Sequence, residues 1–201
     1  MTPSQPLPAT RVIGHEDPDE LLVERCLEGD HAAFTVLVLR YQRPIYNAAY
    51  RVTGREEDAS DVTQTVFLKV AEKLGDFDTR YRFFSWIYRI AMNESLNLLR
   101  RNGRDQPLDE DAEPAGPESA GPEWQASQAQ ASERIQKVLM GMKPSDRAVI
   151  TLRHFSDCSY EEIGQVLDID VKTVKSRLFE ARSRMRALLA DFRPAEGAAA
   201  R

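Results

Sequence analysis

Aromatic, asparagine and arginine side chains alternate along the segment from Phe77 to Arg101. Projected at 100° per residue, one side of this predicted helix carries an unusual mixture of side chains: Trp86, Arg89, Asn93, Asn97 and Arg100. Asparagine can hydrogen-bond to base edges, arginine can hold phosphates, and tryptophan can stack on an unpaired base. The face therefore favours binding to opened nucleic acid. The alternative, that the aromatic residues are core and the polar side is merely hydrated, stays open for Phe83 and Tyr88 individually.

The segment from Ser159 to Met185 predicts a short helix, a tight turn and a longer basic helix. Ser159 and Glu162 have the spacing of a capping box, and Asp170 can cap the second helix. An apolar stripe follows along that helix at Val174, Leu178, Ala181, Met185 and Leu188. The opposite side carries cationic, hydroxyl and aromatic groups: Lys172, Lys175, Ser176, Phe179 and Arg182. This pattern is typical of a helix-turn-helix that enters the major groove, although an ordinary helical hairpin remains the alternative.

A third polar surface follows the predicted helix from Arg55 to Leu74. Asp58, Asp61 and Thr65 lie opposite its apolar stripe, with Gln64 at the edge. An acidic edge repels phosphate, so it suits a basic protein partner better than DNA. Most such edges are simply hydrated, and alone this one indicates little.

Other chemistry finds no support in the chain. No nucleophile–base–acid set, phosphate-binding loop or metal-ligand spacing is present, so we expect no catalytic residues, no metal site and no cofactor. Cys26 and Cys158 lie far apart and are expected to be reduced, structural thiols. The net charge of −5 is uneven, because residues 34–104 and 128–201 are net basic whereas 1–33 and 105–127 are net acidic. DNA binding depends on the local patch, so the acidic total does not exclude it.

Helical spacing recurs along the chain without a convincing alternating strand, which predicts an all-α fold. Helices are expected at 19–27, 31–52, 55–74, 82–101, 131–140 and 145–155, ahead of the helix-turn-helix, with Pro44 kinking or splitting the second. Residues 105–127 are rich in proline and acid and predict a flexible linker. The expected organisation is therefore two small helical domains, 19–104 and 128–193, flanked by disordered tails at 1–18 and 194–201.

The order of these segments resembles a bacterial sigma factor, and more specifically the small extracytoplasmic-function group. The resemblance rests on the helix DASDVTQTVFLKVAEKL, the aromatic helix FFSWIYRIAMNESLNLLRR, an acidic linker and the motif SYEEIGQVLDIDVKTVKSRLFEAR, in that order. It covers roughly residues 19–190. The chain departs from the usual pattern at Asp168, where glycine is frequent, and at Glu180, where a basic residue is common.

The resemblance implies a role for each group. Asp58, Asp61 and Gln64 match the helix that docks on the β′ clamp helices of core RNA polymerase. Lys69, Lys73 and Phe77 match the neighbourhood of the pocket that captures a flipped promoter base, as base extrusion requires. The helix that recognises and melts the minus-ten element is matched by Trp86, Asn93 and Asn97, with Arg89 and Arg100 on the same face. In the second domain, Arg153 matches a phosphate contact, and the helix that reads the minus-thirty-five duplex is matched by Lys172, Thr173, Lys175, Ser176, Phe179 and Arg182.

The implied function is that of a promoter-specificity subunit for a stress or envelope response, not an enzyme. Its expected partners are promoter DNA, core RNA polymerase (β′ clamp helices and β flap) and a cognate anti-sigma factor. The free protein is expected to be a cytoplasmic monomer that does not insert into the membrane, although an anti-sigma factor can hold it there. The runner-up is a conventional helix-turn-helix regulator that binds a palindromic operator as a dimer.

Overall fold

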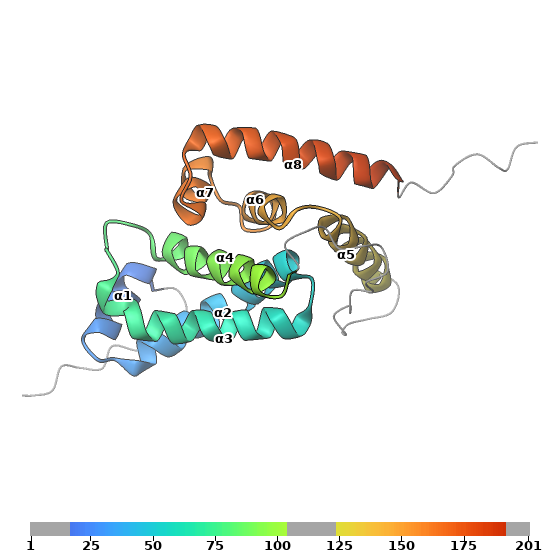
Figure 1. The fold of residues 1–201 in the computed structure, drawn as a ribbon. Coiled ribbons are helices and arrows are strands. Elements are labelled where there is room, and N and C mark those ends of the chain that lie inside the picture. Colours follow the sequence, from blue (N-terminus) through green and yellow to red (C-terminus); the bar gives the residue numbers. More distant parts are fainter. Residues whose placement is uncertain (1–16, 104–123, 192–201) are drawn as a thin grey trace, which may run out of the picture.

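The computed structural model describes residues 17–103 and 124–191, and within those ranges the secondary structure is helical (Figure 1). The elements are α1 Asp19–Leu27, α2 His31–Thr53, α3 Glu56–Lys73, the 3₁₀ turn η1 Leu74–Asp76, α4 Phe83–Arg101, α5 Trp124–Met140, α6 Pro144–His154, α7 Tyr160–Leu167 and α8 Val171–Asp191. This confirms the predicted all-α fold class.

Helices α1 to α4 pack around one apolar core in the N-terminal half. Asp30 begins α2 by accepting hydrogen bonds from the backbone amides of Ala32 (2.9 Å) and Ala33 (3.3 Å). Gly54 ends the same helix in the left-handed region, with φ 81°. Pro44 was expected to kink or split this helix; it does not split α2, which continues through it. Buried residues before and after the proline, among them Tyr41 and Ile45, hold both parts of α2 in the same core.

The C-terminal half consists of the crossed helices α6, α7 and α8, with α5 beside them. The predicted apolar stripe of α8 faces inward: Val174, Leu178 and Ala181 are all buried. In Figure 1, α8 lies across the top of the molecule, and α6 and α7 lie between it and α4.

The two halves pack against each other, with α7 on α4 and α6 on α2. Arg147 of α6 is fully buried, and its Nη1 donates to the carbonyl of Val52 in α2 (2.9 Å). Gln136 of α5 donates to the carbonyl of Tyr50 (3.0 Å). The Val52 carbonyl lies in the last turn of α2, where carbonyls lack partners within the helix, so Arg147 supplies its donor. The Tyr50 carbonyl also accepts from the backbone amide of Gly54 (2.8 Å).

The remaining differences from the sequence predictions concern the ends of helices, and several predicted segments lie outside the described residues. Helix α5 begins at Trp124, earlier than the expected Ala131. The rest of the expected linker and nearly all of both expected disordered tails lie outside the described residues. None of the helices in the described ranges has the length and apolar character needed to cross a lipid bilayer.

Candidate nucleic-acid interface

Helix α4 presents the polar face that its sequence predicts. Arg89, Asn93, Asn97 and Arg100 are exposed. Asn97 Oδ1 accepts a hydrogen bond from Arg100 Nη2 at 2.7 Å, which leaves the Asn97 amide NH₂ group on an accessible surface. The face therefore offers amide groups between two guanidinium groups, as contact with bases and phosphates requires.

Trp86 is half-buried at one end of this face, and other aromatic rings hold it in place. Its ring centroid lies 5.1 Å from that of Phe77 and 5.7 Å from that of Phe83. Phe83 and Tyr88, for which the sequence leaves a core role open, are both buried. Phe83 and Tyr88 thus belong to the core, and packing against Phe77 and Phe83 holds Trp86 at the surface.

A pocket of about 380 Å³ lies beside Trp86. Phe77, Ser85, Trp86 and Arg89 line it from the N-terminal half, together with Asp76, Asp78 and Tyr81. Gln165 and Asp168 line it from the C-terminal half. The pocket combines aromatic walls with polar groups, which suits a flat, polar ring such as a base.

The two lysines assigned to this neighbourhood lie in different environments. Lys69 of α3 donates to Glu94 Oε1 at 2.6 Å, at the edge of α4 that faces α3. The structure therefore pairs Lys69 with α4 rather than adding it to the pocket beside Trp86. Lys73 is exposed in the last turn of α3, shortly before Phe77.

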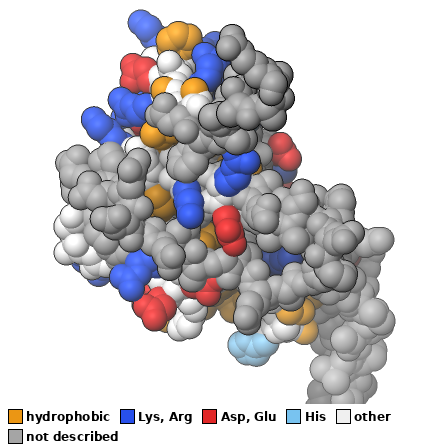
Figure 2. All heavy atoms as spheres, turned by 90° about the vertical axis from the view of Figure 1, so that its right-hand side faces the viewer, with side chains coloured by type: hydrophobic (Ala, Val, Ile, Leu, Met, Phe, Trp, Pro, Cys, Tyr) orange, Lys and Arg blue, Asp and Glu red, His pale blue; other side chains and the backbone are white. Residues whose placement is uncertain are grey.

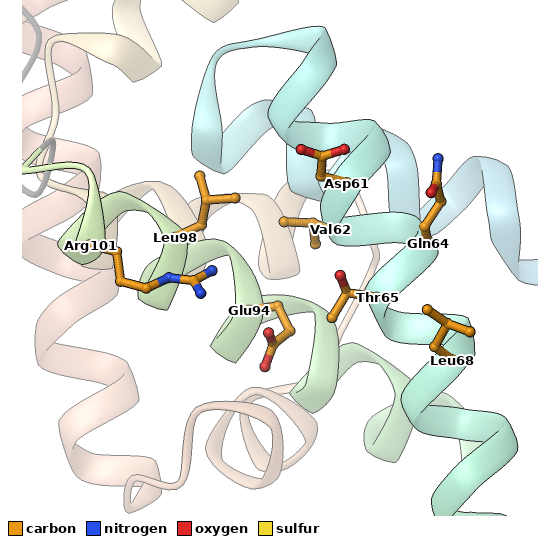
Figure 3. Close-up of a pocket in the computed structure, with 8 residues that line it drawn as sticks. All are labelled: Asp61, Val62, Gln64, Thr65, Leu68, Glu94, Leu98 and Arg101. Atoms are coloured by element: carbon orange, nitrogen blue, oxygen red, sulfur yellow. The ribbon is translucent and has the colours of Figure 1, made fainter.

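The acidic edge of α3 borders a groove between α3 and α4 (Figure 3). Asp61 and Gln64 are exposed and line this groove of about 320 Å³, whereas Asp58 is half-buried one turn earlier. Leu68 also lines it and is 64 % exposed, which is unusual for a leucine. Leu68 was not among the residues predicted from the sequence, although it lies off the buried stripe of α3 and this position could have indicated an exposed apolar contact.

The helix-turn-helix forms through the predicted local contacts. Ser159 Oγ accepts from the Glu162 amide (3.1 Å) and Glu162 Oε2 accepts from the Ser159 amide (2.8 Å), which completes the capping box. Asp170 Oδ1 accepts from the Thr173 amide at 2.8 Å and begins α8. Asp168 adopts the left-handed conformation with φ 56°, which explains why glycine suits this position. A Cβ atom on Gly164 would lie 2.8 Å from the carbonyl oxygen of Ile169, so the turn requires glycine there.

Helix α8 exposes the side chains expected to read DNA. Lys172, Lys175 and Ser176 are exposed, and Phe179 is 76 % exposed. Thr173 is half-buried and its hydroxyl donates to Asp170 Oδ2 at 2.8 Å. Viewed toward the end of α8 (Figure 2), basic, acidic and hydrophobic side chains mix on the upper part of the molecule, where α8 lies.

The two arginines of this half that were assigned to DNA, Arg153 and Arg182, also have partners within the protein. Arg182 Nε donates to Nε2 of His154 at 3.2 Å. Burial and the nearby charges of Arg182 and Arg153 lower the pKa of His154, so its neutral ring can accept this bond. Arg153 Nη1 donates to the carbonyl of Cys158 (2.8 Å), and its guanidinium lies over the ring of Tyr160. Arg153 therefore orders the segment that leads into α7, in addition to any contact with phosphate.

Known families match both halves of the chain. Sigma-70 region 2 matches residues 37–105, and Sigma-70 region 4 matches residues 132–185. The RNA polymerase sigma-H factor of Pseudomonas aeruginosa is 35% identical over 83% of this chain and 91% of its own length. The extracytoplasmic-function RNA polymerase sigma-E factor of Escherichia coli K12 is 38% identical over 82% of this chain and 90% of its own.

Two solved structures share the fold of this chain. CnrH, in complex with the cytosolic domain of CnrY, is 27% identical with a TM-score of 0.68, over 87% of this chain and 99% of that one. The sigma factor RpoE of Bartonella quintana, in complex with the anti-sigma factor NepR, shares the fold with a TM-score of 0.64 at 22% identity, over 80% of this chain and 98% of that one. With both regions present in order and near-complete coverage of its relatives, the chain belongs to the extracytoplasmic-function group of RNA polymerase sigma factors, which act in transcription initiation.

Proposed function

We propose that this sigma factor reads a two-part promoter, with α4 on the opened minus-ten strand and α8 on the minus-thirty-five duplex. The observation that carries the proposal is the exposed face of α4, where Trp86 adjoins Arg89, Asn93, Asn97 and Arg100. A wedge or stacking group beside amides and guanidinium groups suits bases that have left the duplex.

The α8 surface suits intact duplex DNA. Its exposed side chains begin in the first turn, at Lys172, and continue through Lys175 and Ser176 to Phe179. In helix-turn-helix proteins the N-terminal residues of the second helix reach base edges in the major groove. Two weak contacts on one chain reinforce each other through effective concentration once polymerase holds both.

Transcription in vitro tests the role of α4. The double variant Asn93→Ala/Asn97→Ala removes both amides from an exposed surface, so it should lower promoter-dependent transcription by core RNA polymerase by about tenfold or more. The template is a genomic fragment library, which also reveals the promoter sequence. Gln42→Ala is the matched control, because Gln42 is an exposed amide on α2. Equal activity of both variants would contradict the proposal.

The groove between α3 and α4 is the proposed docking site for core polymerase. Asp61 and Gln64 supply polar groups and Leu68 an exposed apolar contact. Asp61→Ala/Gln64→Ala should weaken co-purification with core polymerase by about tenfold. Glu72→Ala, which removes an exposed acid farther along α3, should leave co-purification unchanged. An equal loss of co-purification in both variants would show that the change in net charge, and not the groove, causes the effect.

We further propose a cognate inhibitory partner and a cytoplasmic location. CnrH and RpoE are each described in complex with another protein, in the second case an anti-sigma factor. An inhibitor that covers Leu68 and the α3–α4 groove would exclude polymerase, and a membrane-anchored one would place this sigma factor under envelope control. Affinity purification from cells before and after envelope stress tests this, and absence of an inhibitory partner in both conditions would contradict it. The protein acts by binding, without a reaction of its own.

A further inference from the structure

The guanidinium of Arg182 is held by a neighbouring helix of the same half. Helix α6 packs on α8, and His154 is the last residue of α6. Arg182 Nε donates to His154 Nε2 at 3.2 Å. Arg182 is among the side chains expected to bind the minus-thirty-five duplex, whereas His154 is not. The bond therefore connects a DNA-binding side chain to a histidine that has no role in the function proposed so far.

This hydrogen bond leaves most donors of Arg182 available. Nη1 and Nη2 have no hydrogen-bond or ion-pair partner within the described residues. The guanidinium group is planar and rigid, so an acceptor at Nε fixes the direction in which both terminal nitrogens point. Two terminal donors in a fixed plane suit the bidentate binding of a phosphate or a base edge.

Orienting Arg182 before DNA arrives favours binding. An arginine side chain has many rotamers, and a free one loses this freedom when an interface immobilises it. Arg182 is half-buried and bonded to His154, so part of this ordering is already present in the free chain. An acceptor supplied by α6 therefore strengthens the contact that Arg182 makes from α8.

His154 can accept this bond only while its ring is neutral, because a protonated imidazole has two donors and no acceptor. Burial, and then the charges of Arg182 and Arg153, lower the pKa of His154. From α2, Arg51 lies over the ring of the neighbouring Phe155, 4.2 Å from its centroid. The charged groups around this end of α6 are thus cationic, and they favour the neutral form that can accept.

Acids on the elements around α6 are paired elsewhere or exposed. The paired acids are Asp146 with Arg184, Glu162 with Arg82, and Glu94 with Lys69. Helix α2 contains no acid. The exposed acids Asp157, Glu161 and Glu180 are not among the causes that shift the pKa of His154. The protonation of His154 is therefore governed by the arginines beside it and by burial.

We propose that His154 is a positioning residue for DNA binding: its neutral ring holds Arg182 with both terminal nitrogens available to the minus-thirty-five duplex, and its protonation releases Arg182. The proposal rests on the proposed function of α8 and adds control by acid to it. Because the pKa of His154 lies below the ordinary value, the bond is intact at neutral pH. It is lost, and binding weakens, only as the pH falls below about 6.5, the ordinary histidine value.

The contact itself can be tested by NMR titration of the free, full chain. The chain has three histidines, and His154→Gln identifies the signal of His154. Arg182→Ala removes a neighbouring positive charge, so the pKa of His154 should rise toward the ordinary value. Arg186→Ala removes an exposed arginine one turn later on α8 and should leave this pKa unchanged. An unchanged pKa in Arg182→Ala overturns the contact and the proposal with it.

Transcription by holoenzyme tests the effect on DNA binding. The template is a promoter fragment recovered from the genomic library, and the measured quantity is the holoenzyme concentration that gives half-maximal transcription. It is measured about one pH unit above and one below 6.5. His154→Leu has no acceptor and should raise this concentration about fivefold at the higher pH, as expected when one long side chain loses its support.

His154→Gln is the variant that rescues. Its amide oxygen can take the place of Nε2 as acceptor but does not titrate. At the higher pH His154→Gln should match wild type, and at the lower pH wild type should need about fivefold more holoenzyme than His154→Gln. Comparison at equal pH cancels the pH dependence of the polymerase. His31→Gln, at an exposed histidine of α2, is the matched control and should follow wild type at both values.

A double variant separates positioning from direct contact. If His154 acts through Arg182, then His154→Leu has no further effect in the Arg182→Ala background. An equal loss in that background overturns the positioning role. Wild type that binds more tightly than His154→Gln at the lower pH overturns it as well, because protonated His154 would then bind phosphate as a cation.

Failure of the proposed function has its own signature. If Arg182→Ala transcribes like wild type although the NMR titration shows the contact, Arg182 does not bind promoter DNA, and the proposal is overturned for that reason. Phe179→Ala then reports separately on α8, because Phe179 is an exposed side chain of the same helix that does not depend on His154.

Discussion

Single side chains of this sigma factor serve two structures at once. Glu162 completes the capping box that begins α7 and also pairs with Arg82 of the other half. Burial raises its pKa, but the hydrogen bonds from Ser159 and the charge of Arg82 outweigh burial, so the net pKa lies below the ordinary value. The negative charge of Glu162 is therefore stabilised by the fold.

This coupling predicts a pH dependence. A lowered pKa contributes stability above the unfolded-state value, about 4.3 for glutamate, and the contribution is lost as the pH falls through the lower folded-state value. Glu162→Gln should therefore lower the urea midpoint at pH 7, and the difference from wild type should shrink below about pH 4. Glu161→Gln serves as the control, since Glu161 is exposed next to it. An undiminished difference in acid would show that Glu162 acts through packing alone.

At the scale of elements, α8 divides its side chains between the core and a free surface. Leu178 is 1% exposed, whereas its neighbour Phe179 is 76 % exposed. An exposed phenylalanine ring gains no stabilisation from hydrophobic burial in the isolated chain, so its exposed position favours a role in binding.

The two neighbours should respond differently to truncation. Leu178→Ala should lower the free energy of unfolding by about 3 kcal/mol, because it leaves a cavity in the core. Phe179→Ala should change it by less than about 0.5 kcal/mol but weaken transcription from promoters that need the minus-thirty-five element. Chemical denaturation and transcription in vitro measure the two effects. A large loss of stability in Phe179→Ala would place its ring in the fold.

The predictable elements are those with strong local signals. The bounds of α1 follow directly from the sequence, and the capping box at Ser159 and the cap at Asp170 form as their spacing predicts. Long-range contacts could not be predicted from local signals. No local sequence pattern indicates that Arg147 is buried or that Lys69 pairs with Glu94. The polar side of α4 was predictable because its periodicity is local, whereas the contact of α7 with it depends on how two halves pack.

At the scale of the molecule, Arg147 connects the two halves. Its guanidinium supplies donors to three backbone carbonyls, those of Val52, Met140 and Met142. These acceptors belong to both halves, so one buried side chain satisfies the end of α2 and orders the turn between α5 and α6.

Removal of this side chain should affect the whole protein. Arg147→Ala leaves buried carbonyls without a charged donor and should lower the free energy of unfolding by about 3 kcal/mol. Because the bond to Val52 couples the halves, calorimetry should also show their transitions separate. Arg186→Ala, at an exposed position of α8, should change stability by less than about 0.5 kcal/mol. A single, unshifted transition in Arg147→Ala would contradict this role.

The same bond has a consequence for synthesis on the ribosome. The donor to the Val52 carbonyl, Arg147, lies 95 residues later in the chain. At translation rates of about 5–20 residues per second, that interval lasts roughly 5 to 20 s. In the later part of this interval α4 is complete, whereas α7, which packs on it, is still to be made, and the Val52 carbonyl is exposed to water. Each newly made molecule therefore passes through a stage in which α7 does not yet cover α4. A partner that acts during translation would find the polar face of α4 exposed.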